Sequence, residues 1–222
     1  MKMRYILIIV VALIGFTACE EDNYKAPDVQ LEGDLLYNGK KVATKRAQMR
    51  VELYEKGWDF EKEIPVLSNQ DGHFSTILFK GDYKLFVKKD RGSFQNFTDT
   101  DTIHFKLDGY KKLDVEVKPF FYIEEPSFTV NGDMLQATFN FEKVVAEKEV
   151  GAVKLLVGKT TLVDEQYKVV EETLSEVTSM NNVVISADIS SLKSKGYCYA
   201  RIAVGTKGVN TYNYSFVKKI EL

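Results

Sequence analysis

The sequence has few of the residues on which most enzymes and metal sites depend. Its 222 residues include two histidines, two cysteines and one tryptophan. Neither His73 nor His104 has a second histidine or a cysteine at the spacing of metal ligands. The sequence also lacks a G-x-S-x-G nucleophile elbow, a glycine-rich phosphate loop and an HExxH motif. We therefore expect no enzymatic activity, no cofactor and no metal. The alternative of a glycoside hydrolase stays open from the sequence, because that reaction needs only two carboxylates that face each other.

An excess of positive charge is absent as well. The chain has 30 Lys and Arg residues against 32 Asp and Glu residues, which gives a net charge of −2. Proteins that neutralise a phosphate backbone need a basic surface. We therefore do not expect nucleic-acid binding.

Long apolar runs are confined to the N-terminus. Lys2 and Arg4 precede the uninterrupted apolar segment 5–14 (YILIIVVALI), and small residues follow just before Cys19. The run is shorter than the roughly 20 residues that a membrane-spanning helix needs. The pattern predicts a cleaved secretory signal over residues 1–18, with an uncleaved anchor as the alternative.

The end of this signal resembles the lipobox of bacterial lipoproteins. It reads Phe16-Thr17-Ala18-Cys19, with Phe16 where leucine is usual. The resemblance implies acylation of Cys19, which then anchors the chain in a membrane through its lipid, followed by a tether over residues 19–27. Several acyl chains give stable anchoring, since each buried methylene contributes about 0.8 kcal/mol. A disulfide between Cys19 and Cys198 is the alternative.

An acidic cluster follows the predicted lipidation site. Residues 20–23 read EEDN, which resembles the surface-export signal of Bacteroidetes lipoproteins. That resemblance implies an outer-membrane protein exposed at the cell surface. The periplasmic face of the membrane is the alternative.

The rest of the chain alternates between apolar and polar residues in short segments. Met49, Val51 and Leu53 alternate with polar neighbours, as in a strand with one buried face. Turn pairs such as Asn38-Gly39 and Asp71-Gly72 separate such segments. The predicted strands are 29–37, 48–55, 73–79, 82–88, 101–106, 111–118, 127–131, 134–142, 152–159, 166–171, 182–188, 197–205 and 211–220.

This inventory predicts an all-β protein with two tandem antiparallel β-sandwich domains. The first domain covers residues 28–121, and the second covers residues 122–222, with the boundary in segment 120–126 (FFYIEEP). Seven strands in about a hundred residues are typical of an immunoglobulin or fibronectin III-like sandwich, which is the prediction for the second domain.

Particular turns and strand residues carry a family resemblance. Segments 70–74 (QDGHF) and 80–83 (KGDY) look like a transthyretin-like, carboxypeptidase-regulatory sandwich. Together with segments 23–27 (NYKAP) and 54–58 (YEKGW), they resemble a Bacteroidetes surface lipoprotein family of unknown function. In the second domain, Ala200-Arg201-Ile202 and segment 212–215 (YNYS) are similar to the same family. Its members are typically encoded in polysaccharide-utilisation loci, beside an outer-membrane glycan transporter and its binding lipoprotein. The resemblance implies a role in polysaccharide capture with those partners.

Aromatic residues in loops are the candidates for contact with a sugar. Trp58 follows a strand end, and Phe94 and Phe97 lie in loop 89–99. Packing of Trp58 in a core is the alternative. Thr102, in Asp101-Thr102-Ile103, resembles a Bacteroides O-glycosylation site.

Two functions therefore remain open after the sequence is read. The first is a non-catalytic outer-membrane lipoprotein that assists glycan capture in a polysaccharide-uptake system. The second is a structural or adhesin-like module that binds a protein partner of the outer-membrane complex, for which exposed sheet edges are suited. Fold alone does not decide between them.

Overall fold

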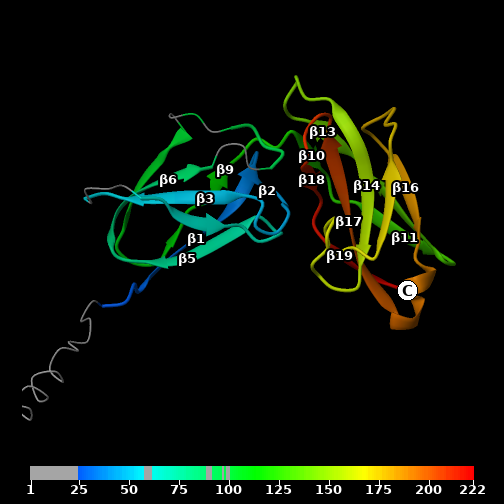
Figure 1. Cartoon of the computed structure of the whole chain (residues 1–222), viewed down its shortest axis with the longest axis horizontal. Coiled ribbons are helices and arrows are strands. Elements are labelled where there is room, and N and C mark those ends of the chain that lie inside the picture. Colours follow the sequence, from blue (N-terminus) through cyan, green and yellow to red (C-terminus); the bar gives the residue numbers. More distant parts are fainter. Residues whose placement is uncertain (1–24, 58–61, 89–91, 97, 99–100) are drawn as a thin grey trace, which may run out of the picture.

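The computed structural model describes residues 25–57, 62–88, 92–96, 98 and 101–222. These residues form a nearly all-β protein with two domains that lie side by side, as Figure 1 shows. The prediction of an all-β fold with two domains is confirmed. Among the described residues, no helix is long and apolar enough to cross a membrane.

The first domain is a sandwich of two sheets. In one sheet β1 pairs with β2, β5, β8 and β9, and in the other the order is β4-β3-β6-β7. The strands are β1 (Val29–Tyr37), β2 (Lys40–Lys41), β3 (Arg50–Glu55), β4 (Ile64–Leu67), β5 (His73–Leu78), β6 (Gly81–Val87), β7 (Ile103–Leu107), β8 (Lys111–Lys112) and β9 (Val115–Glu116).

Strand β1 is the centre of the first sheet and has one unexpected feature. It pairs antiparallel with β5 but parallel with β8 and β9, which adds a parallel pairing to the predicted antiparallel sheet. The predicted strand 111–118 is broken into these two short strands around Leu113. A Cβ atom on Gly33 would meet the Leu113 carbonyl oxygen at 2.0 Å, so this close approach requires glycine at position 33.

The second domain contains the remaining strands. They form a sheet of order β15-β14-β17-β18, in which β19 also pairs with β17, a sheet of order β11-β12-β16, and the pair β10-β13. The elements are β10 (Phe121–Ile123), β11 (Ser127–Asn131), β12 (Met134–Phe139), β13 (Phe141–Lys143), β14 (Val150–Gly158), β15 (Val170–Leu174), β16 (Val183–Asp188), the 3-10 helix η2 (Ser190–Lys195), β17 (Tyr197–Thr206), β18 (Tyr212–Tyr214) and β19 (Lys218–Glu221).

Several further details of the predicted strands differ from the structure. Segment 120–126, predicted as a boundary, contains β10, which pairs with β13 inside the second domain. The predicted strand 166–171 lies later in the chain, as β15. Strand β4 was not predicted, because it contains Pro65, a residue that is unfavourable in most strands. The predicted strand 211–220 is two strands, β18 and β19, both paired with β17.

Each domain has its own apolar core, and a third, smaller cluster lies where the domains meet. The third cluster contains Ala43 of the first domain and Leu156, Val163, Ala203 and Tyr214 of the second. Lys25–Asp28 are exposed and precede the first core residue, Val29. Residues 25–222 therefore contain all core residues of the described structure.

The second cysteine lies in the core of the second domain. Cys198 is fully buried and free of a disulfide, and its burial raises the pKa of the thiol. It packs there as a small apolar side chain. Cys19 lies outside the described residues.

Candidate functional site at the domain junction

The domains are joined by a buried arginine. The Arg201 side chain extends from β17, and its exposed fraction is 0%. Its Nε and Nη2 donate to the Ser215 carbonyl oxygen at 3.0 and 2.8 Å, and its Nη1 donates to the Val163 carbonyl oxygen at 3.2 Å. Its Nη2 also reaches the Thr44 carbonyl oxygen of the first domain at 3.1 Å. Burial lowers the pKa of Arg201 to about 10, so the side chain is still charged at neutral pH.

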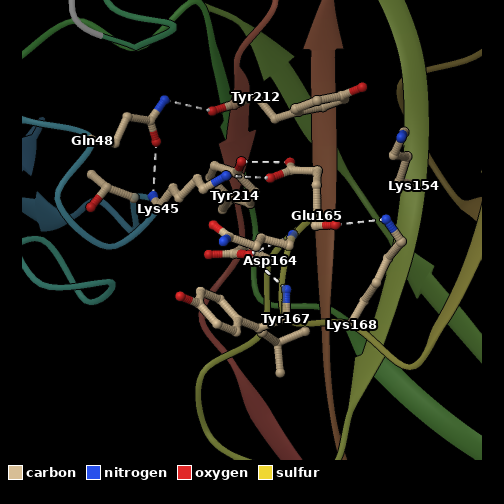
Figure 2. A network of polar contacts seen from close by, with 12 residues as sticks. Lys45, Gln48, Lys154, Asp164, Glu165, Tyr167, Lys168, Tyr212 and Tyr214 are labelled. Atoms are coloured by element: carbon tan, nitrogen blue, oxygen red, sulfur yellow. Dashed lines mark hydrogen bonds and ion pairs between the residues drawn. The ribbon is translucent and has the colours of Figure 1, made fainter.

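A tyrosine continues this contact towards the surface. The Tyr214 ring lies 4.3 Å from the Arg201 guanidinium carbon, and its hydroxyl donates to Glu165 Oε1 at 2.6 Å. Glu165 Oε2 in turn pairs with Lys45 Nζ of the first domain at 3.2 Å. Burial, and then the Glu165 charge, raise the pKa of Tyr214, so its hydroxyl stays protonated. We call Arg201, Tyr214, Glu165 and Lys45 the clasp; Figure 2 shows its outer part.

Further hydrogen bonds cross the junction on either side of the clasp. Gln48 Nε2 donates to the Tyr212 carbonyl oxygen at 3.3 Å. Asn213 Nδ2 donates to the Ser93 carbonyl oxygen at 2.9 Å, and its Oδ1 accepts from the Phe121 N–H at 3.0 Å. These bonds bring loop residues of the first domain against β18. The junction is therefore an ordered contact with both polar and apolar parts.

An open groove of about 790 Å³ lies beside this contact, with walls from both domains. We call it the junction groove. Loop residues of the first domain form one wall, the β13–β14 and β17–β18 loops form the other, and Phe120 lies between them. The lining residues are Gly92, Phe94, Gln95, Asn96, Phe120, Val145, Glu147, Lys148, Gly208, Val209, Asn210 and Thr211.

Two smaller hollows extend the junction groove. One, of about 220 Å³, shares Gln95 and Asn96 with it and continues to Asp101, Glu116 and Lys118. The other, of about 300 Å³, shares Gly92, Asn210 and Thr211 with it and continues below segment 45–48. The three hollows therefore adjoin one another, the smallest within the first domain and the other two at the junction.

The groove combines amide, hydroxyl and charged side chains with apolar surface. Gln95 and Asn210 are exposed on opposite walls, and Lys148 Nζ lies 4.5 Å from the centre of the Phe120 ring. Among the described residues, no three His, Cys, Asp or Glu side chains are grouped as a metal site would require. The lining is therefore suited to hydrogen bonding with a polar ligand of moderate size.

The predicted sugar-contacting residues are only partly described. Trp58 and Phe97 lie outside the described residues. Phe94 forms a β-bridge with Pro119 and is 6% exposed, because its ring packs in the first core. It contributes to the groove wall but presents little open ring face to a ligand. Its role in binding stays a prediction.

The other residues considered from sequence lie apart from the groove or at its edge. Thr102 is half-buried, next to Asp101, whose Oδ2 accepts from the Thr98 hydroxyl at 2.7 Å. His73 Nδ1 lies 3.0 Å from Asp34 Oδ1, and His104 is exposed on β7. O-glycosylation of Thr102 stays a prediction.

Sequence reasoning missed the junction residues as a site. Arg201 and segment 212–215 were considered only as residues that carry a family resemblance. Among them, Arg201 and Tyr214 belong to the clasp. A charged residue within an otherwise apolar strand was the available signal, because Arg is almost never fully buried unless its donors are paired.

Family models match most of the chain. Residues 29–118 match the family described as "Protein of unknown function (DUF3823) N-terminal domain", and residues 121–219 match "Domain of unknown function (DUF3823_C)". No curated protein matches the chain.

Solved structures of related proteins have the same fold. A DUF3823 family protein from Bacteroides ovatus is 31% identical, with a TM-score of 0.83, over 88% of this chain and 100% of that one. Another from Parabacteroides merdae is 28% identical, with a TM-score of 0.81, over 89% and 100%. A candidate carbohydrate binding protein from Bacteroides uniformis is 20% identical, with a TM-score of 0.72, over 89% and 100%. The last likeness shows the fold alone.

Proposed function

Because the chain belongs to the DUF3823 family, we propose that it is a non-catalytic, lipid-anchored outer-membrane protein that captures glycans at its domain junction for a polysaccharide-uptake system. The lipid is carried by Cys19, and the protein faces the cell surface. Its partners are a polysaccharide and, in the membrane, a glycan transporter with its binding lipoprotein.

The junction groove is the observation that carries this proposal. It is open, so a polymer can lie along it and extend beyond both ends, and its two walls belong to different domains that the clasp holds together. Exposed amides on each wall can donate to and accept from sugar hydroxyls. The side chains of Val145, Val209 and Phe120 give apolar surface for the carbon face of a sugar ring. The protein from Bacteroides uniformis that has the same fold, and to which carbohydrate binding is attributed, supports glycan binding as the function.

The position of the N-terminal segment supports an anchor of this kind. In Figure 1 the first described residues leave the first domain at the end that is farthest from the second domain. A lipid on Cys19 would therefore hold the junction away from the membrane by the length of the first domain. Exposed residues such as 25–28 would act as a tether and add to the distance between the lipid and the first domain.

A protein-binding module is the second candidate, and one observation favours it. Leu67, Ile77 and Phe79 are 51%, 61% and 45% exposed, on or directly after β4 and β5, two strands in contact with each other. Exposed apolar residues are found at protein interfaces. Several sheet edges, however, are poorly suited to strand addition: β4 contains Pro65, and β7 exposes His104 and Lys106.

Affinity electrophoresis tests the proposed function. Residues 25–222 are run through native gels that contain plant or host polysaccharides, beside the double variant Gln95→Ala/Asn210→Ala, which removes one exposed amide from each wall. We expect retardation by at least one polysaccharide and loss of most of that retardation in the double variant. Thermal unfolding serves as the folding control, because both side chains are exposed.

A third protein in the same gels, Trp58→Ala, separates the groove from the site that the sequence predicts. Loss of retardation in Trp58→Ala alone would keep the glycan function and move the site away from the junction. Absence of retardation by every polysaccharide would contradict the proposed function and favour the protein-binding module.

A further inference from the structure

The hollow below segment 45–48 has an unusual turn at its edge. The Gln48 N–H donates to the Lys45 carbonyl oxygen at 3.0 Å, which closes a four-residue turn. Within it Ala47 has a φ of 59°, a left-handed conformation that residues with a Cβ rarely adopt. The Ala47 N–H donates to the Ser68 carbonyl oxygen at 2.9 Å, and the Lys45 N–H donates to Gln48 Oε1 at 2.8 Å. Surrounding bonds thus hold a strained turn, as is common at binding sites.

This turn carries an arginine that has no partner among the described residues. Arg46 is exposed, lines the hollow, and makes no hydrogen bond or ion pair with any described residue. Its guanidinium offers five donors in a planar fork, which matches a carboxylate or a sulfate. In contrast, Lys45 beside it is already paired with Glu165 in the clasp.

The charges around the hollow favour an anion. Among the described residues, Glu165 is the one carboxylate that lines it, and both oxygens of Glu165 are engaged, one by the Tyr214 hydroxyl and the other by Lys45. Lys45 and Arg46, both in the lining, carry two positive charges against the one negative charge of Glu165. This excess of positive charge contrasts with the net charge of −2 of the whole chain.

We infer that this hollow is a subsite for an anionic sugar unit, one that carries a carboxylate or a sulfate ester, and that Arg46 is its recognition residue. The inference rests on the proposed function, because the hollow continues the junction groove through Gly92, Asn210 and Thr211. At about 300 Å³ the hollow has room for a single sugar unit. The adjoining groove then holds the neighbouring units of the chain.

The test compares polymers that differ only in charge. Residues 25–222 are run in gels with polygalacturonate or its methyl-esterified form, and with dextran sulfate or dextran. We expect an anionic polymer to retard the protein and its neutral counterpart to do so much less. The carboxylated and sulfated arms separate the two sources of the negative charge. Since the chain itself is acidic, unspecific attraction to a polyanion is not expected.

Variants of single cations identify the residue. Arg46→Gln is expected to weaken retardation by the anionic polymer about tenfold, since a charge-assisted bidentate contact is lost. Arg46→Lys should restore part of it, because the charge returns without the planar fork. Lys106→Gln, which removes an exposed cation that lines none of the three hollows, should behave as the unmodified protein. All three variants should unfold at the unmodified temperature.

The other outcomes separate failure of the subsite from failure of the proposed function. Equal retardation by anionic and neutral forms, or full retardation of Arg46→Gln, overturns the subsite for an anionic sugar while the proposed glycan function stands. Absence of retardation by any of these polymers or those of the wider panel overturns both.

Discussion

The clasp and the junction groove lie side by side at the junction, but their polar side chains differ in burial and in hydrogen bonding. In the clasp, the fully buried Arg201 donates to three carbonyl oxygens, and Glu165 has a partner for each oxygen. In the groove, the exposed Gln95 and Asn210 side chains face open space. A buried polar group has to be paired within the protein, whereas an exposed one can exchange water for a ligand.

This difference separates structural from binding residues at the junction. Substitutions in the clasp should change the free energy of unfolding and the connection between the domains. Substitutions in the groove should change ligand binding and leave stability almost unchanged. The following predictions test that division.

Arg201→Met should have the largest effect. The variant fills part of the volume but leaves the carbonyl oxygens of Thr44, Val163 and Ser215 without their donor. We expect the free energy of unfolding to fall by about 3 kcal/mol or more. Urea unfolding followed by circular dichroism measures it, and the domains should begin to unfold separately. Arg46→Gln, an exposed arginine nearby, should leave the curve in place; a similar loss there would contradict the division.

Tyr214→Phe should have a smaller effect. The ring over Arg201 is kept, while the 2.6 Å hydrogen bond from the hydroxyl to Glu165 is lost. We expect the free energy of unfolding to fall by about 1.5 kcal/mol, since the donor is buried and the acceptor is a charged, partly buried group. Tyr110→Phe is the matched control, because the Tyr110 hydroxyl donates to Glu32 at 2.7 Å from a ring that is 64% exposed. If both variants lose the same amount, burial is not what strengthens the clasp.

Acid should distinguish the Arg201 hydrogen bonds of the clasp from a buried carboxylate in the first domain. Asp34 is 3% exposed; burial opposes its ionisation, but hydrogen bonds from Lys41 and His73 hold its pKa below the ordinary value of 3.8. Its stabilising effect is therefore complete above that ordinary value and is lost as pH falls through the lower, folded-state pKa. The bonds from Arg201 to carbonyl oxygens do not titrate in this range.

The acid dependence of stability is measured as the urea midpoint at a series of pH values from neutral into the acid range. Asp34→Asn should lower stability at neutral pH and flatten the acid dependence, while Asp82→Asn, an exposed carboxylate on β6, should leave the profile almost unchanged. An acid dependence that Asp34→Asn leaves unaltered would show that another group causes it.

Ala47→Gly should have the smallest effect, and in the opposite direction. Glycine relieves the left-handed conformation at φ 59°, although it adds freedom to the unfolded chain. We expect a gain of about 0.5 kcal/mol in thermal or urea unfolding. Ala47→Val should destabilise the protein, because a β-branched residue tolerates this φ poorly. A loss of stability in Ala47→Gly would mean that the turn is not strained.

Local patterns in the sequence were sufficient to predict many of the strands and turns. The alternation in segment 29–37 matches β1, and Asn38-Gly39 forms the expected hairpin turn, with φ values of 50° and 73° at its two central residues. These features depend on neighbouring residues, so a single sequence contains them. Strand β4 was missed because Pro65 is a weak strand residue, and it is tolerated there because β4 is an edge strand.

The junction could not be predicted, because it depends on contacts between distant segments. Alternation in β17 assigns Cys198, Ala200 and Ile202 to the core and Arg201 to the opposite face, where solvent would be expected. That face is covered by residues near Thr44, which lies 157 positions earlier in the chain. Segment 211–220 breaks at Ser215, whose carbonyl accepts from the distant side chain of Arg201 and whose Oγ accepts from the Ile202 N–H.

The central claim is that the junction groove holds the glycan. Hydrogen–deuterium exchange of residues 25–222, with and without an oligosaccharide from the polymer that retards the protein most, tests this claim directly. We predict slower exchange in segments 92–96, 145–148 and 208–211, with little change in β11 and β12 on the far sheet of the second domain. Protection confined to the segment around Trp58, or no protection at all at a saturating oligosaccharide concentration, would contradict it.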